Sequence, residues 1–123
     1  DGAPVLIDSP GLDPFDAQER ADLTGLSAAA GASSVLVLPA GLDPAEAADL
    51  ASAFGEAGTA LLVATRLDLA RRLGSLLAAA SAGHVLTEAG VGPGAADGLR
   101  AMTPAWLAER LQAAQHPQLR NAA

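Results

Sequence analysis

Short apolar runs alternate with helix-forming stretches along the chain, and this alternation restricts the fold more than any other feature. The apolar runs cover residues 3–8, 33–40, 59–65 and 84–90. Each run is almost continuously apolar instead of alternating with polar residues, which is typical of strands buried on both faces. We therefore predict an α/β domain in which a parallel sheet carries helices on both faces.

Helical patterns fill the intervals between these runs. The predicted helices span residues 16–30, 42–58, 69–80 and 104–115. Asp13 and Asp43 each precede a proline, which is typical of an N-cap, and Thr103 is the expected cap of the last helix. We expect one domain over residues 1–115 and a frayed tail over residues 116–123.

Composition excludes several classes of protein. Apolar residues make up 50% of the 123 residues, which is enough for one globular domain with a core. The net charge is -7 and every basic residue is an arginine, so we expect no surface for duplex nucleic acid. Cysteine is absent, which excludes disulfides and thiolate metal sites. His84 and His116 have no partner at metal-ligand spacing, so we expect both to be structural.

Polar side chains follow the predicted strands at the ends where ligands bind in parallel sheets. Asp8 ends the first apolar run, while Thr65 and Asp68 follow the third and a glycine-rich loop follows Gly90. In open parallel sheets, ligands sit at the carboxyl ends of the strands. We therefore expect these four positions to lie at the same edge of the sheet.

Asp8 is followed closely by Gly11, and the pair suits a phosphate site. A carboxylate at the end of a strand can hold a hydrated magnesium ion, and a glycine amide just beyond it can approach a phosphate. The alternative is that Asp8 only caps a turn. Taken alone, the sequence favours this second interpretation.

Asp68 lies where a carboxylate can select a purine base. It can accept two parallel hydrogen bonds from the N1–H and the exocyclic amine of guanine, a donor pair that adenine lacks. Thr65 can tie the loop together, and the aliphatic stem of Arg66 can lie on the base. The alternative is that Asp68 caps the helix predicted over residues 69–80.

The loop "GVGPG" that begins at Gly90 offers backbone amides and little side chain. It can sit against a base or a phosphate, or it can be a flexible turn into the last segment. Glycine content alone does not distinguish these two interpretations.

In this order, the segments resemble the second half of a GTPase domain of the signal recognition particle (SRP) type. "VLIDSPGLDPFD" resembles the "DTAGR" segment of that family, and "SVLVLPAGLDPAEAADLASAF" resembles its next strand and helix. "TRLDLARRLGSLL" is similar to "TKLD" with its following helix, and "AGVGPGAADGLRAMTPAWLAERL" to the closing guanine loop and final helix. The resemblance covers nearly the whole chain and is greatest to the flagellar SRP-like GTPase.

The resemblance implies a P-loop NTPase fold in three layers whose first half, with the P-loop, is missing. It implies GTP or GDP and Mg²⁺ as ligands, with Asp8 as the catalytic acid that holds magnesium through water and Gly11 as the γ-phosphate amide. The guanine site implied by the resemblance consists of Thr65, Arg66, Asp68, Gly90, Val91 and Gly92.

Several departures from the family pattern reduce the activity that we expect. Arg66 replaces a lysine, Ser9 and Pro10 replace Thr-Ala, and Leu12 replaces an arginine that helps catalysis. The chain has no G-x-x-x-x-G-K-[ST] motif and no lysine, so it lacks a cradle for the β- and γ-phosphates. We therefore expect this chain alone to be inactive, and we favour a truncated GTPase over a degenerate relative.

The implied function is that of a GTP-binding fragment of a bacterial GTPase for protein targeting or flagellar placement. The intact protein would dimerise with a second copy or a related GTPase when nucleotide binds, in the cytoplasm or at the inner face of the cell membrane through other domains. One alternative is a non-catalytic interaction module of the same fold. Another is a partitioning-type ATPase, which "DSPG" suits but which Asp68 after Thr65 disfavours. A sheet without its first strands exposes an edge, so we also expect the isolated chain to dimerise or aggregate.

Overall fold

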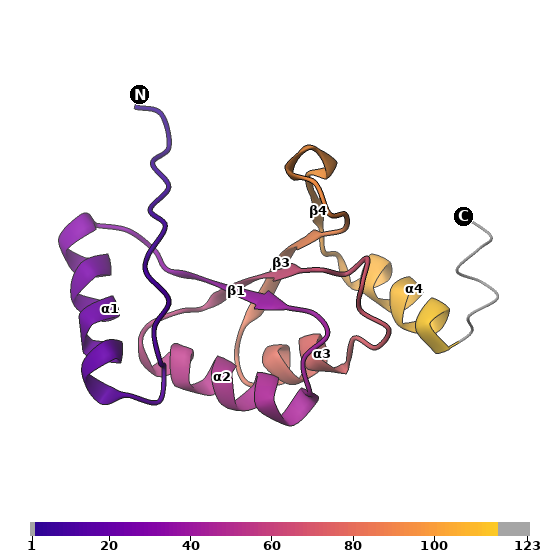
Figure 1. The fold of residues 1–123 in the computed structure, drawn as a ribbon, viewed down its shortest axis with the longest axis horizontal. Coiled ribbons are helices and arrows are strands. Elements are labelled where there is room, and N and C mark those ends of the chain that lie inside the picture. Colours follow the sequence, from indigo (N-terminus) through magenta and orange to yellow (C-terminus); the bar gives the residue numbers. More distant parts are fainter. Residues whose placement is uncertain (1, 116–123) are drawn as a thin grey trace.

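A computed structural model describes residues 2–115 of the chain (Figure 1). The strands are β1 (Val35–Pro39), β2 (Leu61–Thr65), β3 (Val85–Gly90) and β4 (Leu99–Ala101). The helices are α1 (Ala17–Ala30), α2 (Pro44–Glu56), α3 (Gly74–Ser81) and α4 (Pro104–Gln115), with a 3-10 turn, η1, at Ala95–Asp97. The prediction of an α/β domain is confirmed. The frayed tail predicted over residues 116–123 lies outside the described residues.

The four strands form one sheet in the order β1-β2-β3-β4. The first three are parallel, with Val35 opposite Leu61 and Leu61 opposite Val85. The last strand, β4, pairs antiparallel with β3 and places Arg100 opposite Ala89. The sequence predicts only a loop where β4 lies, because a three-residue strand after a glycine-rich segment has no periodicity to detect. This mostly parallel sheet occurs in Rossmann-like and P-loop folds alike and does not distinguish them.

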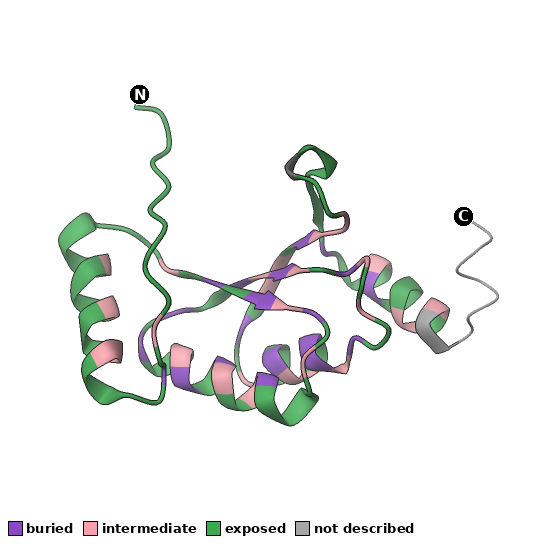
Figure 2. Ribbon diagram, in the orientation of Figure 1, coloured by how far each residue is buried: buried purple, intermediate pink, exposed green. Residues whose placement is uncertain are grey.

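The core lies between one face of the sheet and the pair α2 and α3, which lie side by side (Figure 1). Alternate residues of the strands, Leu36, Leu38, Leu62 and Ala64, are buried on this face. The helices contribute mainly small residues, namely Ala47, Ala51 and Ala79, together with Leu76. Alanine lets the helix backbones approach the sheet closely, so a core with almost no aromatic residues still packs. Figure 2 shows the buried residues gathered along the sheet, α2 and α3.

The opposite face of the sheet is uncovered among residues 2–115. Its side chains are Val35, Val37, Leu61 and Val85, and all four are exposed, with Val37 and Val85 each at 59%. We call these four residues the uncovered face. The prediction of helices on both faces is therefore wrong for the described part of the chain, because α2 and α3 share one face and α1 buries none of its residues.

Residues 3–8 are extended but do not belong to the sheet. The prediction of a first strand there is wrong, although the local composition suits one. Val5 is 83% exposed and Leu6 is 96% exposed, so neither side chain gains a core. The physical reason is that a strand needs a partner edge, and the described segments provide no hydrogen-bonded neighbour for this one.

Two of the predicted helix starts differ from the observed ones. Asp16, not Asp13, caps α1 by accepting hydrogen bonds from two backbone amides of its first turn. The third helix begins at Gly74 instead of residue 69 and has no side-chain cap. Asp43 caps α2 as predicted, and the Thr103 hydroxyl accepts a hydrogen bond at the start of α4.

Candidate functional site

The carboxyl ends of β1, β2 and β3 are joined by backbone hydrogen bonds. The amide of Ala40, just after β1, donates to the carbonyl of Thr65 at 2.9 Å. The amide of Leu67 donates to the carbonyl of Gly90 at 3.1 Å. These bonds bring the segment after β2 against the segment after β3. The predicted meeting of Thr65 with Gly90 at one edge of the sheet is therefore confirmed.

Arg66 turns the chain sharply at the end of β2. Its φ is 59°, which makes it the one non-glycine residue with positive φ in the part of the chain that the structure describes. The amides of Leu69 and Ala70 both donate to the Arg66 carbonyl, and buried Leu67 anchors the turn in the core. The left-handed conformation costs an L-residue roughly 1–2 kcal/mol. The surrounding hydrogen bonds hold the strained residue in place and leave its guanidinium exposed.

Asp68 occupies the middle of this turn and is half-buried. Because α3 begins at Gly74, the alternative in which Asp68 caps that helix is wrong. Within residues 2–115, no hydrogen bond or ion pair engages the Asp68 carboxylate. Asp68 therefore lies one residue from Leu67, which is bonded to Gly90, and its two acceptor oxygens have no hydrogen-bond partner among residues 2–115.

The glycine-rich loop is closed by a carboxylate. Asp97 accepts a hydrogen bond from the amide of Gly94 at 2.7 Å. A Cβ added to Gly92 would lie 2.6 Å from Cγ of Asp97, whereas a Cβ added to Gly90 would meet only ordinary contacts. Gly92 is therefore required by this loop conformation, while Gly90 is not. Val91 is half-buried and packs against the core.

Ser75 links the start of α3 to the same edge. Its hydroxyl donates to the carbonyl of Ala40 at 2.6 Å, and Ser75 is completely buried. Since Ala40 also binds Thr65, the first turn of α3, the end of β1 and the end of β2 form one connected unit. The sequence gives no signal for this bond, because a single serine in a helix start has many uses.

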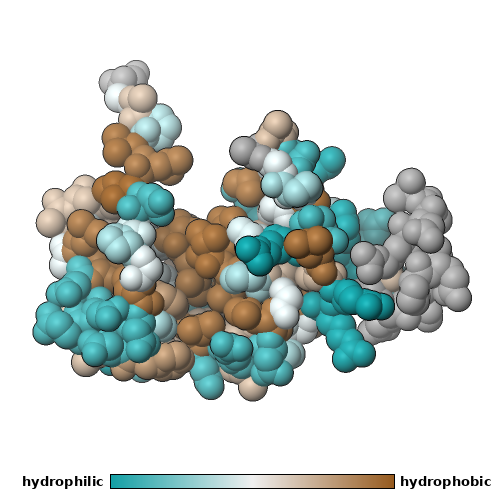
Figure 3. All heavy atoms as spheres, in the orientation of Figure 1, coloured by the Kyte–Doolittle hydropathy of each residue, from teal (hydrophilic) through white to brown (hydrophobic). Residues whose placement is uncertain are grey.

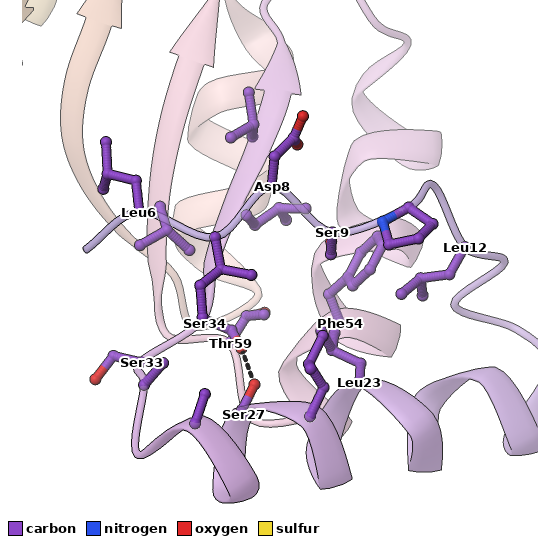
Figure 4. Close-up of a pocket in the computed structure, with 18 of the residues that line it drawn as sticks. Leu6, Asp8, Ser9, Leu12, Leu23, Ser27, Ser33, Ser34, Phe54 and Thr59 are labelled. Carbon is purple, nitrogen blue, oxygen red and sulfur yellow. Dashed lines mark hydrogen bonds between the residues drawn. The ribbon is translucent and has the colours of Figure 1, made fainter.

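Asp8 and Gly11 lie apart from this unit. Both are exposed on the extended N-terminal segment, and a Cβ added to Gly11 would meet no atom within 4 Å. Asp8 lines a hollow of about 490 Å³ that is also bounded by α1 and by residues 33–37 (Figure 4). No hydrogen bond in the described part of the chain joins either residue to Thr65 or Gly90. The structure thus brings Thr65 and Gly90 together at one sheet edge but places Asp8 and Gly11 elsewhere.

The described residues show no cluster of metal-binding side chains. Among residues 2–115 there is no group of three or more His, Asp or Glu side chains that could hold a metal ion. Mg²⁺ in nucleotide sites takes one or two carboxylates together with phosphate oxygens and water. Asp8 is predicted to be one such carboxylate, and the given sequence has no G-x-x-x-x-G-K-[ST] motif that would hold the phosphates.

A second polar group lies at the opposite, amino-terminal end of the strands. Oγ1 of Thr59 and Nε2 of His84 are 2.8 Å apart, and His84 is buried. Nδ1 of His84 is buried without a hydrogen-bond partner among the residues described. Burial lowers the pKa of His84 below its usual 6.5, because the charged form loses its hydration. This pair fastens the chain before β2 to the chain before β3.

Comparison with known protein families finds no family that matches this chain, and comparison with curated proteins finds no match. No helix within residues 2–115 is long and apolar enough to cross a membrane. The site therefore has to be interpreted from its own geometry. Asp68, whose carboxylate has no partner among residues 2–115, the exposed Arg66 and the glycine-rich loop share one sheet edge.

Proposed function

We propose that the edge formed by residues 65–68 and 90–92 binds the base of a guanine nucleotide. In this proposal, the chain is the base-recognising half of a GTPase domain of the SRP type. The observation that carries it is half-buried Asp68, whose carboxylate has no partner within the described part of the chain, in a turn held to Gly90 by the hydrogen bond of Leu67.

The chemistry of this edge favours guanine over adenine. The Asp68 carboxylate accepts from the N1–H and the exocyclic amine of guanine, and adenine has no such donor pair. The exposed side chain of Arg66 covers one face of the base with its aliphatic stem. The backbone of Gly90, Val91 and Gly92 closes the other side. A net contribution of about 1.5–3 kcal/mol is typical for hydrogen bonds to a charged group.

In this proposal, binding of the phosphates and magnesium takes place only in the intact domain. Asp8 would hold magnesium through water and Gly11 would report the γ-phosphate, once other segments bring them to the base site. Support for this step is the resemblance alone, since both residues lie away from Thr65. The proposed domain dimerises with a second copy or a related GTPase when GTP binds, in the bacterial cytoplasm or at the inner face of the membrane. We propose no hydrolysis by this chain alone.

The experiment that tests the proposal exchanges Asp68 for asparagine. Titration calorimetry compares GMP, XMP and AMP, monophosphates being used because the chain has no cradle for further phosphates. We expect wild-type affinity in the millimolar range, a standard free energy of about −4 kcal/mol. The D68N variant should bind GMP at least tenfold more weakly and gain XMP, because the amide can donate to the extra carbonyl of xanthine.

The matched control is D97N, which alters the other carboxylate of this edge. Because Asp97 is bound to Gly94 and is not assigned to the base, the variant should keep the preference for GMP over XMP. Equal effects of D68N and D97N, or wild-type binding of AMP as tight as GMP, would contradict the assignment of Asp68.

A second candidate function is a non-catalytic interaction module. The observation that favours it is the uncovered face, where Val35, Val37 and Val85 are exposed together. A folded chain that binds none of the three nucleotides at 10 mM would support the interaction module over the guanine site. Calorimetry at millimolar nucleotide concentrations therefore decides between the guanine site and the interaction module.

A further inference from the structure

The outer edge of β1 is open to an added strand. β1 is first in the sheet order, so within residues 2–115 only β2 pairs with it. Edge strands in natural proteins are usually guarded by charges, bulges or proline. The sequence of β1, VLVLP, has no charged residue, and its proline comes at the last position. This edge therefore retains unpaired backbone groups beside apolar side chains.

The same molecule carries an extended segment, residues 3–8, that pairs with no strand within residues 2–115. Residues 3–8 belong to no helix or strand, and none of them makes a backbone hydrogen bond within the described part of the chain. Val5, Leu6 and Ile7 are all exposed. Figure 3 shows hydrophobic side chains along this N-terminal segment and over the middle of the molecule. The segment has the composition of a strand, and its backbone amides and carbonyls have no described backbone partner.

The two unpaired elements do not meet within one copy. Residues 5–12, residues 33–37 and α1 all line a hollow of about 490 Å³, and no backbone hydrogen bond is described between the segment and β1 (Figure 4). Its other lining includes the apolar side chains of Leu23, Leu26 and Phe54. Asp8 is the single charged residue among those that line it. The hollow thus suits an extended apolar segment.

We propose that a second copy of this chain fills the hollow, with residues 3–8 of each copy added to β1 of the other. Within the described residues, each copy offers one unpaired extended segment and one unpaired edge, so a two-fold exchange satisfies both at once. The exchange also brings side chains of the partner over Val35 and Val37. Asp68 is not among the residues that line this hollow, so the inference does not depend on nucleotide binding.

The area available sets the strength of this dimer. Fully burying one aliphatic side chain removes roughly 60–120 Å² of apolar surface from water. The exposed parts of Val5, Leu6, Ile7, Val35 and Val37 therefore bury on the order of 600 Å² over two copies. Stable complexes bury about 1,200–2,000 Å². We expect a weak dimer, with a dissociation constant on the order of 10–100 μM.

Sedimentation equilibrium of the 123-residue chain between 5 and about 500 μM tests the proposal, a range chosen around the expected constant. We expect a monomer–dimer equilibrium that strengthens at high salt, because each copy carries a net charge of -7 and salt screens the repulsion. L6D should raise the dissociation constant at least tenfold. L99D is the matched control, because Leu99 is exposed on β4 at the other edge of the sheet.

Crosslinking identifies the surfaces, and the chain suits it because it has no cysteine. Mixed L6C and V37C single variants should form a disulfide-linked pair between copies, while L99C mixed with V37C should not. A strict monomer, or a dimer lost in L99D instead of L6D, would overturn the proposal. So would rapid intramolecular closure of the L6C/V37C double variant at low concentration, which would show that the segment docks on its own β1.

Discussion

Replacing Ser75 with alanine tests the link that holds the candidate site together. The Ser75 hydroxyl donates to the Ala40 carbonyl at 2.6 Å, and the serine is completely buried. Without the hydroxyl, the carbonyl loses this partner in a dry environment, which costs about 1–3 kcal/mol. Alanine recovers about 0.5 kcal/mol through its higher helix propensity. The free energy of unfolding should therefore fall by about 1.5 kcal/mol.

Urea denaturation measures this loss as a shift of the transition midpoint at unchanged slope. For a slope of about 2 kcal/mol/M, the midpoint of S75A should fall by about 0.7 M. S81A is the matched control, because Ser81 is exposed at the other end of the same helix and should change stability by less than about 0.5 kcal/mol. If S75A and S81A gave the same midpoint, Ser75 would not fasten α3 to β1, and the connected unit at the sheet edge would be refuted.

Three further predictions concern His84, Gly92 and Arg66. Burial lowers the pKa of His84 in the folded protein, so its contribution to stability is complete above pH 6.5 and is lost as pH falls below that value. In an H116Q background, in which His84 is the only histidine, the free energy of unfolding in urea should fall between pH 7 and pH 5. A free energy that stays constant over this range would contradict the prediction. G92A should displace Asp97 from the Gly94 amide and cost about 1 kcal/mol, whereas G90A, which meets only ordinary contacts, should be nearly neutral. The free energy of unfolding of R66A should be about 1 kcal/mol lower than that of R66G, because alanine keeps the strain of the left-handed conformation and glycine relieves it. Equal urea midpoints of the two variants would show that no strain is stored there.

Hydrophobic patterning was sufficient for the elements that pack on a single sheet face. The runs at 33–40, 59–65 and 84–90 contain β1, β2 and β3, and each is bounded by helix or turn signals. Parallel pairing then follows from the helices between them. The same pattern is misleading at residues 3–8, where an apolar run pairs with no strand among the described residues. Composition gives the tendency to form a strand, but the partner is a tertiary property.

The candidate site was predictable where it follows from topology. Parallel strands bring their carboxyl ends together, and Thr65 does meet Gly90 in this way. The start of α3 was not predictable, because the stretch after Asp68 has helical periodicity and the turn that interrupts it rests on hydrogen bonds to the Arg66 carbonyl. Arginine is not a residue that signals a positive φ, so sequence alone gives no hint of the strained turn.

The predicted position of Asp8 depends on residues 3–8 being a strand of the sheet. The prediction that it shares an edge with Thr65 assumed that residues 3–8 form a strand of the sheet. Because that segment is unpaired, Asp8 instead lines the hollow beside residues 33–37. Its predicted role with magnesium stays a prediction, and it requires segments that would seat residues 3–8 in the sheet.

The central claim is that the edge at the ends of β2 and β3 recognises a guanine base. The most direct measurement is a titration of the ¹⁵N-labelled chain with GMP, followed by amide shifts in NMR spectra, with AMP as the control ligand. We predict saturable shifts at Arg66, Asp68, Gly90, Val91 and Gly92 with GMP and none with AMP. Equal shifts with both nucleotides, or shifts confined to the hollow beside residues 5–12, would contradict the account.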